Sequence, residues 1–402
     1  MKIALLTGGS DRPYAFGLLG ALVAKGIEID FIGSDEFTEE EVLIDPGVQF
    51  LNLRGNTDPN VPAVQKITRI TRYYFRLLQY TARSDSPVFH ILWANRFPLL
   101  DRVLLSGFYK LFGKRLVFTA HNVNEGQRDG KDSLYNRLTL KALYALVDYI
   151  FVHTKNMREQ LTREFGVDQR KISVIPFGIN NTMPKSKLTE SEARKILDLR
   201  EDHKVMLFFG RIAPYKGLDT AIDALSRLVQ YDDRYRLVVA GRIEKGCQGY
   251  WEEMEASISR LGLEPYVIKR TDFIPEAEVE IFLKSADVSL LPYKSIFQSG
   301  VLFLAYSFGL PVIATDVGSF KEDIVEGRTG LVCRADDAVD LGEKIQAYFQ
   351  SSLFANLQAA RADIMAYGNK KYSWSEVGDI TSRVYASLLG HQKLSEPANT
   401  QN

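Results

Sequence analysis

Two cationic side chains follow a short apolar run in the second half of the chain. After the run Val205–Phe209 come Gly210, then Arg211 and Lys216, and then Gly217. An arginine fork and a lysine point charge just beyond a strand are suited to binding a diphosphate. The alternative is that both are solvated cations of a loop. We expect Gly210 to let the chain turn and Gly217 to mark the start of a helix.

A second candidate for anion binding lies further along the chain. The segment 297–301, Phe-Gln-Ser-Gly-Val, follows another apolar run and opens an amphipathic stretch that reaches Phe308. The first N–H groups of a helix have no partner within it, so the amides of Ser299, Gly300 and Val301 would form a natural anion site. The alternative is an ordinary serine N-cap.

The first half of the chain has glycines and a histidine at comparable places. Gly8 and Gly9 follow the first apolar run, and a tight turn between a strand and a helix is their plainest interpretation. His121 comes just after the run Leu116–Thr119. A lone histidine is most often structural. In parallel sheets, however, ligands bind beyond the carboxyl ends of the strands, so His121 is a candidate binding residue.

Short apolar runs alternate with helix-length amphipathic stretches along the whole chain. Four to seven near-continuous apolar residues are typical of strands covered on both faces of a parallel sheet. The fold class is therefore predicted to be α/β, with two doubly wound, Rossmann-like domains that face each other across a cleft. The predicted strands are 2–7, 29–33, 88–93, 116–119, 149–153 and 172–176 in the first half, and 205–209, 236–240, 266–269, 288–292, 311–314 and 330–333 in the second.

The polar stretch 180–190 predicts a linker between these two sets of strands. The N-terminal domain then covers residues 1–179 and the C-terminal domain residues 191–372. A terminal helix is expected at 373–390. The polar residues 391–402 are expected to form a flexible tail.

Composition argues against several classes of protein. Lys and Arg together number 50, as do Asp and Glu, so the net charge is zero, which argues against a nucleic-acid partner. Cys247 and Cys333 are far apart and form neither a disulfide framework nor a metal motif, which fits a reducing, cytoplasmic compartment. The first apolar run is too short for a signal peptide. No run approaches the roughly 18 apolar residues of a membrane-spanning helix.

Residues 66–83 predict an amphipathic helix. Arg69, Arg72, Arg76 and Arg83 line one flank of it. A basic flank beside aromatic and aliphatic side chains is compatible with peripheral contact at the inner face of an anionic membrane. The alternative is a solvated helix face.

The chain as a whole resembles glycosyltransferase family 4, whose members have the GT-B fold. In the C-terminal domain, the run Gly309–Gly318 is similar to the family pattern G-x-P-V-I-A-T-D-x-G. Arg211 and Lys216 match the family's Arg and Lys after the first strand of that domain. The segment 174–179 resembles the close of the family's first domain. Trp374 resembles the point at which the terminal helix crosses back.

The resemblance implies a retaining glycosyltransferase. Such an enzyme moves a sugar from a nucleotide diphosphate donor, expected to be UDP-linked, to a hydroxyl of a glycan, a lipid-linked acceptor or a small molecule. Synthesis of cell-surface polysaccharide or a glycoconjugate is the expected setting. The nucleotide sugar is a co-substrate, and no further cofactor is expected. No metal is expected either, since the chain has no Asp-x-Asp motif.

Residue roles carried over from the family remain expectations. Arg211 and Lys216 would stabilise the departing diphosphate, and the amides of residues 299–301 would assist them. His121 matches a histidine that reaches the donor sugar. The Gly8–Gly9 loop would lie against the donor phosphates and the acceptor.

The chain departs from the family at one important place. Members commonly carry two glutamates seven residues apart, and the matching positions here are Ile296 and Leu304. A subset of the family with Ser-Gly-Val in this loop also lacks the pair. Glu322 is therefore expected to hold the ribose in place of the missing glutamate. Asp272, Phe273 and Ile274 are expected to flank the base.

Other functions remain open at this stage. A nucleotide-sugar epimerase would have the same fold and act without an acceptor. A phosphorylase would need pyridoxal phosphate on a lysine and a longer chain. A degenerate module that binds a nucleotide or a partner enzyme would explain the missing glutamates, but the retained Arg211, Lys216 and His121 argue against it.

Overall fold

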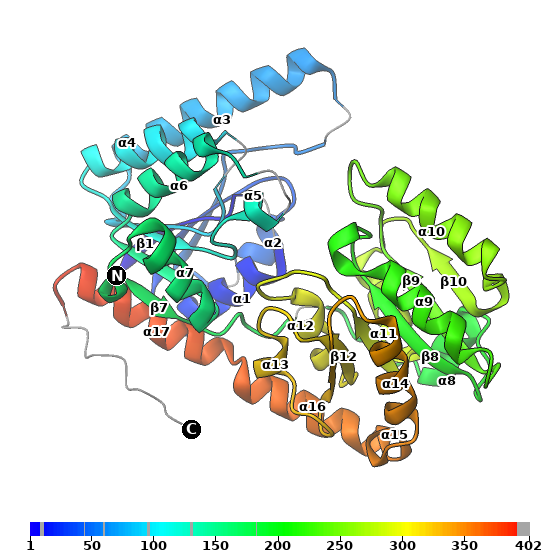
Figure 1. The fold of residues 1–402 in the computed structure, drawn as a ribbon. Helices are drawn as coiled ribbons and strands as arrows, with labels where there is room; N and C mark the ends of the chain where they lie inside the picture. Colours follow the sequence, from blue (N-terminus) through cyan, green and yellow to red (C-terminus); the bar gives the residue numbers. More distant parts are fainter. Residues whose placement is uncertain are drawn as a thin grey trace. The chain divides into compact units, whose positions relative to one another are not determined.

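The computed structural model divides the chain into two compact units (Figure 1). Unit 1 comprises Met1–Gly178 together with Ser373–Asn402, and unit 2 comprises Ile179–Tyr372. The terminal helix therefore belongs to unit 1, although it follows unit 2 in the sequence. The structure describes residues 1–8, 12–43, 45–58, 61–94, 97–128, 132–181 and 183–391.

Unit 1 is built on a seven-stranded parallel sheet with the order β3-β2-β1-β4-β5-β6-β7. The strands are β1 (Lys2–Leu6), β2 (Glu28–Gly33), β3 (Val48–Asn52), β4 (Val88–Ile91), β5 (Arg115–Thr119), β6 (Tyr149–Val152) and β7 (Ile172–Val174). Six of them were predicted, and the omission of β3 was wrong. This strand lies at the edge of the sheet and carries the polar residues Gln49 and Asn52, so it lacks the continuous apolar run of a central strand.

Helices cover both faces of this sheet. Side chains alternate along β4: the ring of Phe89 contacts Tyr80 and Tyr109, whereas His90 contacts Tyr385. Helices α3 and α4 therefore lie on one face and α17 on the other, where it packs along α1 (Figure 1). The helices of unit 1 are α1 (Arg12–Val23), α2 (Glu39–Val42), α3 (Ala63–Arg83), η1 (Leu99–Leu104), α4 (Leu105–Leu111), α5 (Glu125–Arg128), α6 (Leu134–Leu146), α7 (Lys155–Phe165), η2 (Gln169–Lys171) and α17 (Trp374–Leu388).

Unit 2 is built on a six-stranded parallel sheet with the order β10-β9-β8-β11-β12-β13. All six strands were predicted, with ends that differ by one residue at most. The runs of the central strands β8, β11 and β12 are apolar because these strands are nearly buried on both faces, whereas the edge strand β10 exposes Lys269 and Arg270. The strands are β8 (Lys204–Phe209), β9 (Tyr235–Ala240), β10 (Val267–Arg270), β11 (Val288–Leu291), β12 (Val312–Thr315) and β13 (Gly330–Cys333).

Helices α9, α10 and α14 share one hydrophobic core with this sheet. Elsewhere in unit 2, α11 packs against α8, and α12 packs against α16. In the described part of the chain, no helix has both the length and the apolar sequence needed to cross a membrane. The helices of unit 2 are α8 (Glu190–Ile196), η3 (Pro214–Lys216), α9 (Leu218–Leu228), α10 (Gln248–Arg260), η4 (Glu264–Tyr266), η5 (Glu276–Glu278), α11 (Val279–Ser285), α12 (Gly300–Ser307), α13 (Phe320–Asp323), α14 (Ala338–Phe349), α15 (Ser352–Ala355) and α16 (Leu357–Lys371).

Helix α17 is held against α1 by small residues. A Cβ atom at Gly17 would lie 2.1 Å from Cε2 of Trp374, so the indole ring occupies the place of a side chain. Trp374 in turn packs edge-on against Tyr14, with ring centroids 5.2 Å apart. The same helix pair thus orients Tyr14, which reaches the carboxyl edge of the sheet.

His90 on β4 links α17 to the centre of the sheet. Its Nδ1 lies 2.5 Å from the hydroxyl of Tyr385, and its Nε2 lies 2.7 Å from the hydroxyl of Thr119. The side chain is completely buried, and this burial lowers the pKa of His90 to about 3. The folded protein therefore holds His90 in the neutral form.

We expect Gly17→Ala to destabilise unit 1 and Gly20→Ala to stabilise it. Both positions lie in α1, where alanine is favoured over glycine by about 0.5–1 kcal/mol. A Cβ at Gly20 meets no atom within 4 Å, whereas one at Gly17 displaces Trp374, and overpacking costs about 1–3 kcal/mol. Urea denaturation followed by circular dichroism measures both changes. Equal effects of the two substitutions would show that Trp374 does not constrain α1.

We expect the free energy of unfolding to fall as the pH decreases from about 6.5, in part because of His90. Its folded-state pKa lies below that of an exposed histidine, so between the two values only the unfolded chain takes up the proton. One such group contributes about 1.4 kcal/mol per pH unit, or about 2 kcal/mol between pH 6.5 and 5. Urea denaturation at several pH values measures this loss. In His90→Gln, the free energy of unfolding lost between about pH 6.5 and 5 should be smaller than in the parent protein by that amount. The exposed His391, changed to Gln, serves as the control and should leave the pH dependence unaltered.

Candidate functional site

In unit 2 the strand order reverses between β8 and β11, the place where ligands bind in doubly wound sheets. The loops that follow these two strands touch there. Gly217 has a φ of +69°, and a Cβ atom on it would lie 1.9 Å from the carbonyl oxygen of Pro292. Glycine is therefore required, and it allows the loop after β8 to lie directly against the loop after β11.

This approach gathers four of the residues predicted from the sequence. Lys216 is 6% exposed, and its Nζ lies 5.2 Å from the ring centroid of Tyr293. Tyr293 is buried, and its hydroxyl lies 3.3 Å from Oγ of Ser299. A Cβ atom at Gly210 would lie 2.9 Å from the Lys216 Nζ and 3.4 Å from Cγ2 of Val301. The structure thus places a buried ammonium group beside the start of α12.

The start of α12 offers hydrogen-bond donors. Ser299 occupies the N-cap position, but its side chain does not cap the helix, because its Oγ donates to Tyr293 instead. The serine-cap alternative is therefore wrong. Among the described residues, no group accepts a hydrogen bond from the backbone N–H of Gly300 or Val301. These two donors and Lys216 together are suited to an anion.

Arg211 lies outside this group. Its side chain is 61% exposed, and its guanidinium lies 3.7 Å from the carboxylate of Glu244. A long, exposed pair of this kind contributes little to stability, so Arg211 is able to change partner. The exposed Asp272 and Phe273 follow β10 with the half-buried Ile274, and the exposed Glu322 lies in α13. Asp272, Phe273, Ile274 and Glu322 thus come from the loop after β10 and from α13, not from the touching loops after β8 and β11.

The two positions where the family carries glutamates have no polar role. Leu304 is buried in α12. Ile296 contributes its backbone, since its carbonyl oxygen lies 2.4 Å from the place of a Cβ on Gly318. The next carbonyl, of Phe297, accepts a hydrogen bond from the N–H of Ser319 at 3.0 Å. This loop is therefore fixed by its main chain.

In unit 1 the strand order reverses between β1 and β4, and the loops after these strands also touch. Gly8 has a φ of +63°, and a Cβ on it would lie 2.4 Å from the carbonyl oxygen of Trp93. Gly9, the other predicted glycine, lies outside the described residues. The indole of Trp93 stacks on the ring of His121, with centroids 4.3 Å apart and planes 5° apart. Gly8 and His121 are thus linked through Trp93.

His121 is held by a second histidine. Its Nδ1 lies 3.1 Å from Nε2 of His153, whose own Nδ1 lies 3.3 Å from the carbonyl oxygen of Ile175. Burial lowers the pKa of His153 to about 4. Burial, and to a lesser degree His153 and His90, hold the pKa of His121 well below its ordinary value. Both rings are therefore neutral near pH 7.

This arrangement assigns the tautomers. A carbonyl only accepts, so His153 donates from Nδ1 to Ile175 and its Nε2 is an acceptor. His121 must then donate from Nδ1, which leaves its Nε2 as an acceptor. That Nε2 is buried and has no partner among the described residues. It is available to a hydroxyl group of a ligand.

Sequence reasoning missed most of the surroundings of His121. An aromatic enclosure packs around it at ring-centroid distances of 4.3–5.8 Å. Trp93, His153 and Phe177 follow β4, β6 and β7, respectively. Their positions after strand ends could therefore have identified them from the sequence as neighbours of His121. The enclosure consists of Tyr14, Trp93, His153 and Phe177.

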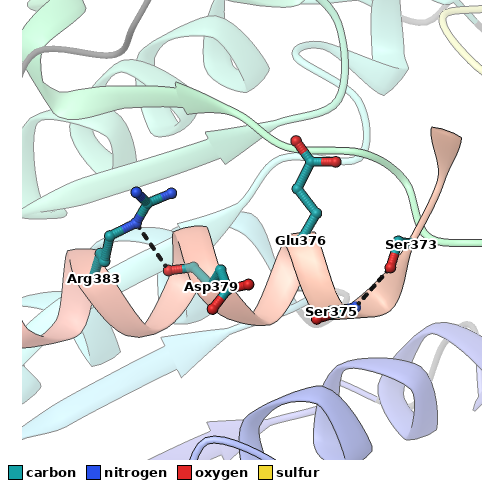
Figure 2. Close-up of a pocket in the computed structure, with 5 residues that line it drawn as sticks. All are labelled: Ser373, Ser375, Glu376, Asp379 and Arg383. Carbon is teal, nitrogen blue, oxygen red and sulfur yellow. Dashed lines mark hydrogen bonds between the residues drawn. The ribbon is translucent and has the colours of Figure 1, made fainter. Parts of the chain in front are cut away.

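A separate hollow of about 460 Å³ lies along α17 (Figure 2). Its lining comes from this one helix and its N-cap. Ser373 Oγ accepts from the N–H of Ser375, Arg383 Nε donates to the carbonyl of Asp379, and the Asp379 carboxylate pairs with Lys25. The polar groups of Ser373, Asp379 and Arg383 are thus bonded to the helix or to Lys25, and nothing in the lining indicates a chemical site. Among the described residues, no group of three His, Cys, Asp or Glu side chains could hold a metal ion.

Two family models match the sequence. The model "Glycosyltransferase Family 4" matches residues 12–182, in unit 1 and the start of unit 2. The model "Glycosyl transferases group 1" matches residues 203–351, in unit 2. The D-inositol 3-phosphate glycosyltransferase of Nocardia farcinica is 26% identical over 286 residues, which are 68% of this chain and 61% of that protein. The matches span between 53% and 61% of the length of the first three curated relatives.

Solved structures share the fold over almost the entire chain. Sucrose-phosphate synthase from Thermosynechococcus elongatus has a TM-score of 0.76 at 18% identity, with 98% of this chain and 100% of that chain covered. Anabaena HepE in complex with UDP-glucose has a TM-score of 0.72 at 16% identity, with 96% and 100% covered. The family models and these structures agree with the two parallel sheets. The two models together match residues 12–182 and 203–351, most of the chain, so the chain belongs to glycosyltransferase family 4 and has the GT-B fold.

Proposed function

We propose that the chain transfers a sugar from a UDP-sugar to an acceptor hydroxyl with retention of configuration. The observation that supports this most is the buried Lys216 beside the unpaired amides of Gly300 and Val301. A diphosphate placed there would receive one cation and two N–H donors in a poorly hydrated position. Such charge-assisted hydrogen bonds contribute roughly 1.5–3 kcal/mol each. Arg211 would join them when it leaves Glu244.

The proposed reaction is a front-face displacement. The bond from the anomeric carbon to the diphosphate oxygen breaks, and the acceptor oxygen bonds to that carbon on the same face. The acceptor proton passes to the departing phosphate oxygen. The protein then positions the reactants and stabilises the negative charge on the diphosphate, and both can lower the barrier substantially. Lys216, Arg211 and the α12 amides take the second role.

His121 has a different task in this proposal. Its buried Nε2 is an acceptor, so it would take a hydrogen bond from a hydroxyl of the donor sugar. The stacked indole of Trp93 and the bond to His153 fix the ring, so the acceptor is preorganised. A neutral ring also adds no charge that would hold the diphosphate after the reaction.

The donor and acceptor classes rest partly on similar proteins. HepE is described in complex with UDP-glucose, and the Nocardia relative is named for transfer to D-inositol 3-phosphate. We therefore propose a UDP-linked hexose as the donor and a glycan, lipid-linked or small-molecule acceptor, in synthesis of a polysaccharide or glycoconjugate. Glu322 is proposed to hold the ribose and residues 272–274 to flank the base.

We further propose peripheral membrane contact through α3. This helix exposes the large apolar side chains Val64, Ile67 and Phe75, which are between 59% and 74% exposed. Four arginines lie along its length. Apolar side chains next to a basic flank are typical of helices that lie on an anionic membrane.

We expect Lys216→Ala to weaken UDP binding and to lower turnover at least about tenfold, because it removes a charge-assisted contact of roughly 1.5–3 kcal/mol. Arg211→Ala should act in the same direction. The matched control is Lys269→Ala, an exposed lysine of unit 2 that pairs with Glu255. Calorimetric titration with UDP measures binding, and mass spectrometry with UDP-sugars and pooled acceptors measures transfer.

The same assays separate the alternatives. Transfer should continue in EDTA, since cationic side chains and amides meet the diphosphate charge. Product formation without any acceptor, with the sugar converted to its epimer, would identify an epimerase. Binding of UDP with neither transfer nor slow hydrolysis of any UDP-sugar would identify a non-catalytic module. Unchanged UDP affinity in both the Lys216 and Arg211 variants would refute the diphosphate role.

We expect His121→Phe to reduce turnover about tenfold or more while the affinity for UDP stays nearly unchanged, because UDP lacks the sugar. Phenylalanine keeps a ring for Trp93 to stack on but offers no acceptor, and an unpaired buried hydroxyl costs about 1–3 kcal/mol. His121→Gln, which retains an acceptor oxygen, should recover part of the activity. Loss of UDP binding in His121→Phe, or full turnover, would contradict the assignment.

A further inference from the structure

A second hollow, of about 390 Å³, lies in unit 1 between α3 and the loop that follows β3. Four arginines are among the residues that line it, and no acidic residue is among them. Arg69, Arg72 and Arg76 are spaced three and four residues apart, so they share one flank of α3. Arg54 faces them from the loop after β3. The volume of the hollow falls within the usual range for small-ligand sites, about 300–1,000 Å³.

The charge of this hollow is not neutralised within the described structure. Arg54 donates to the carbonyl of Gly8, and Arg69 donates to the carbonyl of Asp58 at 3.3 Å, but in the described residues no carboxylate forms an ion pair with any of the four. Some exposed arginines elsewhere are paired, as Arg170 is with Asp168 and Arg234 with Asp232. Others, such as Arg242 and Arg270, form no ion pair in the described structure, but they do not line a common hollow with other arginines. Four guanidinium groups without a counter-charge indicate a site for an anion with several acceptor oxygens.

The hollow lies at the same edge of the sheet as His121. Arg54 follows the carboxyl end of β3, and its guanidinium holds the carbonyl of Gly8 after β1. Gly8 lies against Trp93, which stacks on His121. A continuous line of contacts therefore leads from Arg54 to His121. The apolar side chains of Val61 and Val64 form another part of the lining.

We propose that this arginine hollow binds a phosphate monoester carried by the acceptor, and this proposal rests on the proposed glycosyl transfer. A monoester presents up to two negative charges and three free oxygens, which match several guanidinium forks better than a carboxylate does. The phosphate anchors the acceptor in unit 1, and the diphosphate of the donor is bound by different residues in unit 2. The monoester belongs either to a soluble sugar phosphate or to a lipid headgroup.

The test uses arginine modification by phenylglyoxal in the full chain, followed by peptide mass spectrometry. Inorganic phosphate should slow the modification of Arg72 and Arg76 but not that of Arg170 or Arg234. Chloride at the same ionic strength should protect none of them. Equal protection by chloride, or no protection by phosphate and by the vesicles described below, would overturn the proposal.

Variants make the measurement specific. Arg69→Ala should raise the phosphate concentration needed to protect Arg72 at least about tenfold, because one charge-assisted contact is lost. Arg170→Ala changes the net charge equally and should leave the phosphate concentration needed to protect Arg72 unchanged. The affinity for UDP should remain as in the parent in both variants. An equal loss of protection in both variants would mean that only net charge matters, which contradicts a built site.

Two further protection experiments distinguish a soluble sugar phosphate from a lipid headgroup. Protection by inorganic phosphate supports a soluble acceptor, whereas protection only by phosphatidylcholine vesicles that contain phosphatidic acid supports a lipid headgroup. Equal protection by pure phosphatidylcholine vesicles would indicate mere surface coverage and overturn the proposal. If phosphate protects these arginines but no UDP-sugar is turned over, the proposed transfer fails while the anion site stands. If turnover occurs without protection, only the anion site fails.

Discussion

Direct contact between main chains at the carboxyl edge of each sheet is the constraint on which the rest of the site depends. At the place where the strand order reverses, which is where ligands bind in doubly wound sheets, the loops after two neighbouring strands lie against each other. Gly8 lies against the carbonyl of Trp93, and Gly217 lies against the carbonyl of Pro292. A side chain at either glycine would come within 3 Å of that carbonyl, so the loops would separate. The same requirement occurs once in each unit.

Burial makes the gathered groups effective. Lys216 lies over the ring of Tyr293 in a place that little water reaches, and an ion interacts more strongly with its partners in such surroundings. His121 shows the opposite consequence of burial, because the low pKa keeps it neutral and turns its Nε2 into an acceptor. One unit thus presents positive charge and N–H donors, and the other presents a lone pair. Neither arrangement depends on a pair of carboxylates.

The neutral net charge conceals an uneven distribution of charge. Three arginines of the described structure pair with an aspartate two residues away, namely Arg170 with Asp168, Arg200 with Asp202 and Arg234 with Asp232, so these local charges cancel. The arginines around the hollow at α3 have no such neighbour in the described structure, and three of them come from one flank of a helix. Helical spacing therefore concentrates positive charge at one place on a chain whose Lys and Arg equal its Asp and Glu.

The sequence by itself determined most of the fold, because continuous apolar runs between glycines and caps are sufficient to locate buried parallel strands. It also placed Arg211, Lys216 and His121 after strand ends. It missed β3, whose edge position needs no continuous apolar run. Only the tertiary structure decided that Tyr293 lies between Lys216 and Ser299, and that His153 fixes the tautomer of His121. These partners lie on different strands or loops that meet through sheet order, and no spacing along the chain encodes such a meeting.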